Sequence, residues 1–222
     1  MAFAGAFVAC SPTAVAQPRA DQARPRDLRA LHERAVYATV LITTPIASAT
    51  GWLLAQAGRP LVITNAHVAN TVGLRGASVF FYAGSERPPV EVHATRAWTS
   101  GRIDLGILRL DADAPSTARP LVLRTSTTVV RGERIVLGGN PATGQGGVLP
   151  FQTTEGVVTG QIARSDFAQC GVGRNCIVID AASFAGSSGG PALNVDGQLV
   201  GMLWGGPVQN DSRGDGDRWA DA

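Results

Sequence analysis

Ser188 lies in a run of glycine, serine and proline, GSSGGP at residues 186–191, between two apolar segments. Such a run favours neither a helix nor a strand, because glycine loses much backbone freedom on ordering and proline lacks an N–H donor. A serine hydroxyl is a weak nucleophile, so acyl transfer needs a base beside it and hydrogen-bond donors for the oxyanion. We expect the N–H groups of Gly186 and Ser188 to be these donors, because glycine leaves amides uncovered. The run therefore indicates that Ser188 is a nucleophile.

Three histidines are available as the base. His67 follows the apolar run LVIT, where a strand would end and a side chain can face a cleft. His93 falls inside an alternating, strand-like segment, which is typical of a surface or packed histidine. His32 lies in a polar stretch of helical character, and we expect it to be solvated. These contexts predict His67 as the general base.

A catalytic imidazole also needs a carboxylate that orients it. Asp104 directly precedes the apolar run LGILRL, so its side chain would be partly buried and would need a partner such as His67. Asp111 and Asp113 fall in a polar, proline-bearing stretch and are expected to be solvated. We therefore predict Asp104 as the orienting carboxylate, with a plain turn residue at the start of a strand as the alternative.

The order of these residues distinguishes classes of serine hydrolase. Residues 186–190 also fit the G-x-S-x-G elbow of α/β-hydrolases, but that fold needs a histidine after the serine, and none follows Ser188. The subtilisin order would need Asp21 or Asp27, which lie in a linker-like stretch. The order that remains, His then Asp then Ser, is that of the chymotrypsin-type enzymes.

Many short apolar runs must position these side chains. Glycines (27) and prolines (13) separate the runs along the whole chain, and only short segments such as 27–35 have helical character. This pattern predicts an all-β protein, built as two β-barrels or a split sandwich, with a connection at 111–120. The expected strands are 36–43, 50–55, 60–64, 77–82, 89–95 and 105–110, followed by 120–124, 134–138, 151–163, 176–181 and 198–204.

Composition restricts the partners. The 222 residues are 45% hydrophobic, enough for one large or two small cores. The net charge is +2 and no Lys/Arg cluster occurs, so we expect no nucleic-acid partner. No stretch reaches the roughly 18 apolar residues of a membrane span. No metal or organic cofactor is expected, and a polar tail at 210–222 is expected to be disordered.

The N-terminus resembles an export signal. Residues 1–10 are small and apolar, and residues 14–16 resemble an A-x-A cleavage site. We therefore predict an export signal and linker at 1–27 and a periplasmic or secreted protein. FVAC at 7–10 is also similar to the lipid-attachment box of bacterial lipoproteins, which would place a lipid anchor on Cys10. The alternative is a frayed apolar N-terminus.

With Cys10 removed or lipidated, two cysteines remain. Cys170 and Cys176 close a short polar loop, and an even pair in an exported protein predicts a disulfide. A loop this short would add about 2 kcal/mol of stability. A zinc site is not expected, because no histidine or further cysteine lies nearby.

The chain resembles the trypsin-like (chymotrypsin-fold) serine peptidases, and especially the bacterial HtrA/Deg proteases. TNAHV at 64–68 is similar to the family's T-N-x-H-V around the catalytic histidine, and DLGIL at 104–108 to its D-L-A-V-L. Three more blocks resemble HtrA segments: RGERIVLGGNP (131–141), TTEGVVTG (153–160) and DAASFAGSSGGPALNVDGQLVGM (180–202). The resemblance covers roughly residues 36–206.

This resemblance implies two six-stranded antiparallel Greek-key β-barrels, at 28–118 and 119–209, with the active site in the cleft between them. It implies a serine endopeptidase with the triad His67, Asp104 and Ser188 and no cofactor, acting on a protein or peptide substrate. A catalytically silent binding module, or an esterase on the same scaffold, are the rival readings.

Several positions depart from the family pattern. Ser187 replaces the Asn of HtrA proteins and the Asp of trypsin, so we expect no zymogen activated by a buried ion pair. No PDZ domain is expected in a chain of this length. Ala182, Leu203 and Trp204 are the expected substrate pocket, with a plain core aromatic as the alternative for Trp204. The lack of an acid there predicts a small or medium apolar P1 residue. The oligomeric state is left open.

Overall fold

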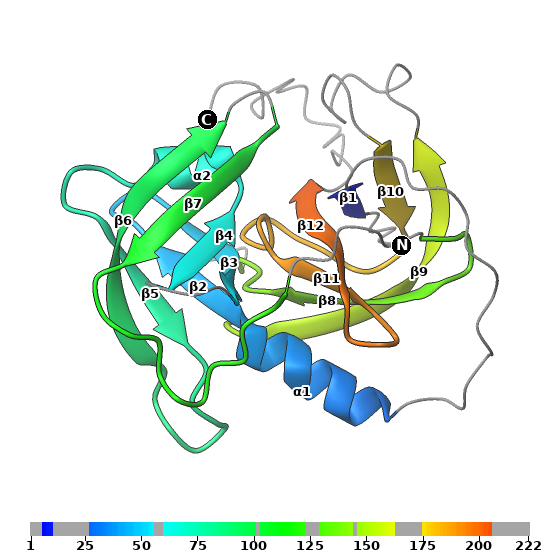
Figure 1. Cartoon of the computed structure of the whole chain (residues 1–222), viewed down its shortest axis with the longest axis horizontal. Coiled ribbons are helices and arrows are strands. Elements are labelled where there is room, and N and C mark those ends of the chain that lie inside the picture. Colours follow the sequence, from blue (N-terminus) through cyan, green and yellow to red (C-terminus); the bar gives the residue numbers. More distant parts are fainter. Residues whose placement is uncertain are drawn as a thin grey trace.

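The computed structural model describes residues 6–10, 27–55, 60–100, 103–122, 129–143, 146–162 and 175–205. Two closed antiparallel β-barrels lie side by side (Figure 1). The strand order of the first barrel is β2 (Thr39–Thr43), β3 (Ser48–Leu54), β4 (Leu61–Thr64), β7 (Leu105–Leu110), β6 (Val90–Ser100), β5 (Ala77–Phe81). That of the second is β1 (Ala6–Cys10), β10 (Asn175–Ile179), β9 (Gln152–Ile162), β8 (Arg134–Gly139), β11 (Pro191–Asn194), β12 (Leu199–Gly205). The prediction of two six-stranded barrels is confirmed.

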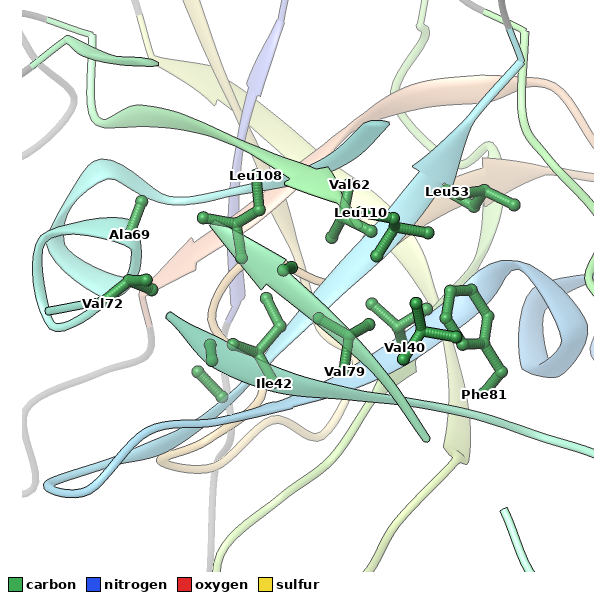
Figure 2. Packing of buried hydrophobic residues seen from close by; sticks show 14 of the residues in the cluster. Val40, Ile42, Leu53, Val62, Ala69, Val72, Val79, Phe81, Leu108 and Leu110 are labelled. Carbon is green, nitrogen blue, oxygen red and sulfur yellow. The ribbon is translucent and has the colours of Figure 1, made fainter. Parts of the chain in front are cut away.

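Alternating side chains build the core of the first barrel. In β5, every second residue is buried, and the buried residues of β2 and β7 face them (Figure 2). Phe81, Ile42 and Leu108 are almost completely buried in this core. Burial of a side chain of this size stabilises the fold by about 1.5–3 kcal/mol. The core therefore makes a rigid wall from which α2 (Ala66–Asn70) and the turn before β7 project.

Besides the barrel cores, a separate hydrophobic cluster joins the two barrels through helix α1 (Leu28–Ala38). The helix packs on β8, β9 and β11 of the second barrel and on β2 of the first. Its buried face carries Leu31 and Ala35, and the cluster also includes Trp52 of the first barrel and Leu193 of the second. This shared packing fixes the orientation of one barrel against the other, and hence the geometry of any site between them.

The helix is longer than predicted. The side chain of Asp27 caps its first turn by accepting a hydrogen bond from Arg29 N–H at 3.0 Å. At the other end, the Thr39 hydroxyl donates to the Ala35 carbonyl at 2.7 Å. Residues 36–38 are therefore helical, and the strand expected at 36–43 begins at Thr39. Burial of Ala38 against the cluster outweighs the β-branched character of the segment.

The remaining differences concern short elements. The sequence pattern gave no sign of α2 or β11, which have 5 and 4 residues. The strand expected at 120–124 is reduced to an isolated parallel bridge between Leu54 and Leu121, and residues 123–124 lie outside the described part. The other expected strands are present within a few residues of their predicted bounds.

Residues Ala6–Cys10 form β1, which pairs antiparallel with both β10 and β12. We expected an export signal here and no strand. The pairing itself does not test export, so the signal and the lipid anchor stay predictions. Residues 11–26, Cys170 and the tail at 210–222 lie outside the described residues. Within the described part, no helix is long and apolar enough to cross a membrane.

Candidate active site

His67 and Asp104 are held together by two hydrogen bonds. The ring Nδ1 of His67 lies 3.0 Å from Oδ2 of Asp104, and the His67 backbone N–H donates to Oδ1 at 2.9 Å. An ionised carboxylate only accepts hydrogen bonds, so in the neutral ring Nδ1 carries the proton and Nε2 keeps its lone pair. No hydrogen-bond partner of Nε2 occurs among the described residues. This arrangement presents an imidazole that can accept a proton.

The environment keeps Asp104 ionised. Partial burial pushes the pKa of this carboxyl upward, but the hydrogen bond and the charge of His67 outweigh burial and hold the pKa below its ordinary value. The Asp104 side chain is 20% exposed, and that of His67 is 43% exposed. The carboxylate is thus shielded while the base faces solvent.

The backbone around Asp104 is positioned by buried neighbours. Asp104 has φ +39°, an uncommon value for a residue with a side chain. The Asn65 side-chain N–H donates to the Asp104 carbonyl at 3.2 Å, and Asn65 is only 1% exposed. A Cβ on Gly106 would lie 2.7 Å from the Asn65 carbonyl oxygen, so glycine is needed for α2 to sit against β7. The helix and the turn are therefore locked at a fixed distance.

The glycine loop leaves two amides without acceptors. The N–H groups of Ser187, Gly189 and Gly190 donate within the protein, at 3.0, 2.9 and 3.0 Å, to Phe184, Leu203 and Ser187 carbonyls respectively. No acceptor for the N–H of Gly186 or Ser188 occurs among the described residues. Two amides without acceptors at these positions are what the predicted oxyanion hole requires.

Ser188 lies against the first barrel. The Thr50 N–H donates to the Ser188 carbonyl at 3.1 Å. A Cβ on Gly189 would overlap the Thr50 carbonyl oxygen and the Thr64 hydroxyl. Thr64 ends β4 three residues before His67, so the loop packs on the part of the barrel that leads into α2. The Ser188 hydroxyl and the His67 ring are not hydrogen-bonded to each other in this structure.

The other histidines are engaged elsewhere. His93 Nδ1 lies 2.5 Å from Asp111 Oδ2, and its Nε2 lies 2.7 Å from the Arg75 carbonyl. His32 is half-buried, with Nδ1 2.7 Å from the Thr153 hydroxyl. The expectation of a solvated His32 was therefore wrong, because a tertiary contact that the local sequence does not show partly buries it. Asp111 is exposed, as expected, and in addition binds His93. Neither histidine joins Ser188.

A pocket of about 180 Å³ opens behind the glycine loop. Ala182 and Leu203 line it together with the buried Ser187, whereas Trp204 is not among its lining residues. Its other apolar lining residues are Leu137, Pro141, Leu149 and Phe184. No charged side chain of the described residues lines the pocket.

No group of three or more metal-ligating side chains is present in the described part of the chain.

Comparison with known proteins identifies the family. Residues 49–202 match the trypsin-like peptidase domain. The chain belongs to this family. The match spans both barrels and includes the segments that carry His67, Asp104 and Ser188.

The chain is similar to one curated protease in sequence and to two solved structures in fold. The serine protease Do-like HtrA of Bacillus subtilis (strain 168) is 31% identical over 148 residues, which are 65% of this chain and 30% of that protein. Deg5 superposes with a TM-score of 0.62 at 21% identity, over 80% of this chain and 87% of that one. Rv3671c of M. tuberculosis H37Rv, in an inactive form, superposes with a TM-score of 0.60 at 24% identity, over 80% and 79% of the two chains. The chain spans about 30% of the length of the HtrA relative.

Sequence reasoning missed two polar residues beside the site, Thr50 and Asn140. Both are completely buried and hydrogen-bonded to each other across the barrels. The only sequence signal is a polar residue inside each of two apolar runs, ATGWLL and VLGGNP. Such a signal indicates a buried polar side chain that needs a hydrogen-bond partner, but it does not identify that partner.

Proposed function

We propose that this chain is a serine endopeptidase whose triad is His67, Asp104 and Ser188. The observation that carries the proposal is the His67–Asp104 pair, in which Asp104 holds the ring through Nδ1 and leaves Nε2 free. Support comes from the loop that bears Ser188, which packs on the same part of the first barrel. Family membership favours the same chemistry.

The reaction follows from these roles. Ser188 Oγ attacks the carbonyl carbon of the scissile peptide bond as His67 Nε2 takes the hydroxyl proton. The oxygen that becomes negative accepts hydrogen bonds from the Gly186 and Ser188 amides. The imidazolium then gives its proton to the leaving amine, and an acyl-enzyme remains. Water, deprotonated by His67, hydrolyses this ester and restores the Ser188 hydroxyl. Asp104 stabilises the imidazolium in both steps.

The pocket beside Ser187 indicates the substrate class. Its lining by Ala182 and Leu203, with no charged side chain, suits an apolar P1 side chain of a protein or peptide. Lysine or arginine at P1 would have no counter-charge there. Trp204 keeps no role in this proposal.

An oxidising, extracytoplasmic location fits the cysteines. Cys176 is disulfide-bonded, and we propose Cys170 as its partner, which would close the short loop before β10. Relatives whose names read chloroplastic and mitochondrial show that the family alone does not fix the compartment. The N-terminal apolar segment therefore carries the proposal of export; cleavage at residues 14–16 would remove β1 and leave β10 and β12 unpaired on that side.

Labelling by a fluorophosphonate probe tests the assignment. Wild-type protein should be labelled and should cleave casein or a peptide library, whereas Ser188→Ala should do neither. Ser116→Ala, at an exposed serine in the connection between the barrels, is the matched control and should behave as wild type. Full labelling of Ser188→Ala rejects the nucleophile. Labelling with cleavage of nitrophenyl esters but no peptides favours the esterase, and absence of labelling in the wild type favours the binding module.

A further inference from the structure

We infer that Thr50 is a positioning residue that holds the oxyanion amides in place; this inference rests on the proposed peptidase function. Thr50 lies in β3 of the first barrel and is completely buried. Its hydroxyl donates to the Gly186 carbonyl at 2.7 Å, and its backbone N–H donates to the Ser188 carbonyl at 3.1 Å. One residue of the first barrel therefore binds the loop of the second at both oxyanion residues.

The direction of the hydroxyl bond is fixed by its other neighbour. Asn140 approaches the Thr50 oxygen with two donors, its backbone N–H at 2.9 Å and its side-chain Nδ2 at 3.2 Å. The Asn140 amide cannot be reversed, because its Oδ1 accepts from Phe151 N–H while its Nδ2 also donates to the Val40 carbonyl. A threonine hydroxyl has one proton and two lone pairs. With both lone pairs taken, the single proton is committed to Gly186.

The carbonyls of residues 185–188 are all anchored by hydrogen bonds. The Ala185 carbonyl accepts from Ala142 N–H at 2.6 Å, and the Ser187 carbonyl from Gly190 N–H at 3.0 Å. A trans peptide carries its N–H opposite its C=O, so these anchors aim the amides of Gly186 and Ser188 away from the loop interior. The peptide between them has one anchor for its carbonyl, the Thr50 hydroxyl.

That middle peptide is held at both of its polar groups, because the Thr50 hydroxyl binds its carbonyl and its N–H, that of Ser187, donates to the Phe184 carbonyl at 3.0 Å. Gly186 has φ +88°, a region that glycine enters and leaves at little cost. Rotation of the Gly186–Ser187 peptide would turn the free amides on both sides of it out of alignment. Thr50 opposes this rotation from the first barrel, whose helix α2 carries His67. The first barrel thus positions the proposed nucleophile, its base and its oxyanion donors.

The decisive comparison is Thr50→Val against Thr50→Ser. Valine has nearly the shape of threonine but cannot donate, so kcat for a peptide substrate should fall about 10- to 100-fold, with KM changed less than about threefold. Affinity for a peptide boronic acid, which places an oxygen in the hole, should fall by a similar factor. The pH–activity profile should keep its shape, because His67 and Asp104 are untouched. Serine restores the donor and should bring kcat within about threefold of wild type.

A matched control removes an equivalent hydroxyl elsewhere. Thr39→Val deletes a buried hydroxyl that donates to the Ala35 carbonyl at 2.7 Å, at the end of α1, and should leave kcat unchanged. If Thr50→Val does not fold, Thr50→Cys keeps a weaker donor and should show a smaller, roughly 3- to 10-fold, loss of kcat. Wild-type kcat in Thr50→Val, or an equal loss in Thr50→Ser, overturns the positioning role alone. A wild-type chain that the fluorophosphonate does not label overturns the proposed function and this role with it.

Discussion

His67 contacts Asp104 through both its ring and its own backbone, so one carboxylate orients the imidazole and also caps the helix that carries it. The two bonds use different oxygens of the same carboxylate. The ring can therefore rotate only by breaking a hydrogen bond to a partly buried charge. This coupling explains how a half-exposed histidine on a five-residue helix keeps a fixed direction.

Asp104→Asn should lower kcat/KM for a peptide about 10³- to 10⁴-fold with the fold intact. An amide at this position can donate to Nδ1 and so favour the tautomer that leaves no lone pair on Nε2, the effect seen when a triad aspartate is replaced in other enzymes. The measurement is steady-state hydrolysis with circular dichroism as a check of folding. Asp113→Asn, at an exposed aspartate, is the control. A loss below about tenfold would contradict the orienting role.

Asp104 should also make stability depend on acidity. The pKa of Asp104 is lower in the folded protein than its ordinary value of about 3.9. Its contribution to the free energy of unfolding is therefore complete above the ordinary pKa and is lost as the pH falls through the folded pKa. Urea unfolding of wild type and Asp104→Asn at pH 7 and pH 3 tests this. The stability advantage of wild type should shrink at pH 3; a constant difference at both pH values argues against it.

His93 should stabilise the first barrel with the opposite dependence on pH. The hydrogen bond that the His93 ring donates to Asp111 is the main cause that raises the pKa of His93 above 6.5; the bond to the Arg75 carbonyl follows, and Glu91 adds a smaller charge effect. Both ring nitrogens face acceptors, so the bound form is the imidazolium. This stabilisation is complete below about pH 6.5 and is lost as the pH rises through the folded pKa.

The corresponding experiment compares melting temperatures of wild type and His93→Gln from pH 5.5 to 9. The gap between the two proteins should be largest at the acid end of this range and should close at the alkaline end. Peptidase activity at pH 7 should be alike in both, since His93 lies in β6 away from Ser188. A gap that widens with rising pH would show that the ring is not held as a cation.

Alanine substitutions at two glycines of similar backbone conformation distinguish the effect of backbone strain from the effect on activity. Gly186 has φ +88° and Gly132 has φ +84°. A Cβ at Gly186 would lie 2.6 Å from the Asn140 carbonyl oxygen, whereas one at Gly132 would meet nothing within 4 Å. Gly186→Ala should lose activity about 10²- to 10³-fold through displacement of its amide. Gly132→Ala should lose about 1 kcal/mol of stability and keep full activity. Equal activity in the two variants would remove Gly186 from the oxyanion hole.

An acid placed in the pocket should change its preference. Ala182→Asp would put a carboxylate on a wall without charged groups, so hydrolysis after Lys or Arg at P1 should rise relative to hydrolysis after Leu or Ala. Ala182→Asn, of the same size and without charge, is the control. Fluorogenic peptides that differ only at P1 give the ratio. An unchanged ratio would mean that this pocket does not receive the P1 side chain.

The sequence predicted most strands of the two barrels because strand alternation and glycine-rich turns are local signals. The short elements escaped for a physical reason: α2 has no side-chain cap at Asn65, and β11 begins with a proline after two glycines. The Thr50–Asn140 bond escaped because it joins residues 90 positions apart. Local sequence indicates that a buried polar side chain needs a hydrogen-bond partner, but only the tertiary structure identifies that partner.

The pairing of β1 with β12 has a consequence for the order in which the protein assembles. The first barrel uses residues 39–110 and has all its strands as soon as that stretch has left the ribosome. The second barrel pairs β1 (residues 6–10) with β12 (residues 199–205), so β1, which is synthesised first, cannot complete its pairing until β12 has been synthesised. Contacts this distant in sequence form slowly. During synthesis the first barrel can therefore act as a finished surface on which the second closes, and the loop that carries Ser188 reaches Thr50 only at that final step.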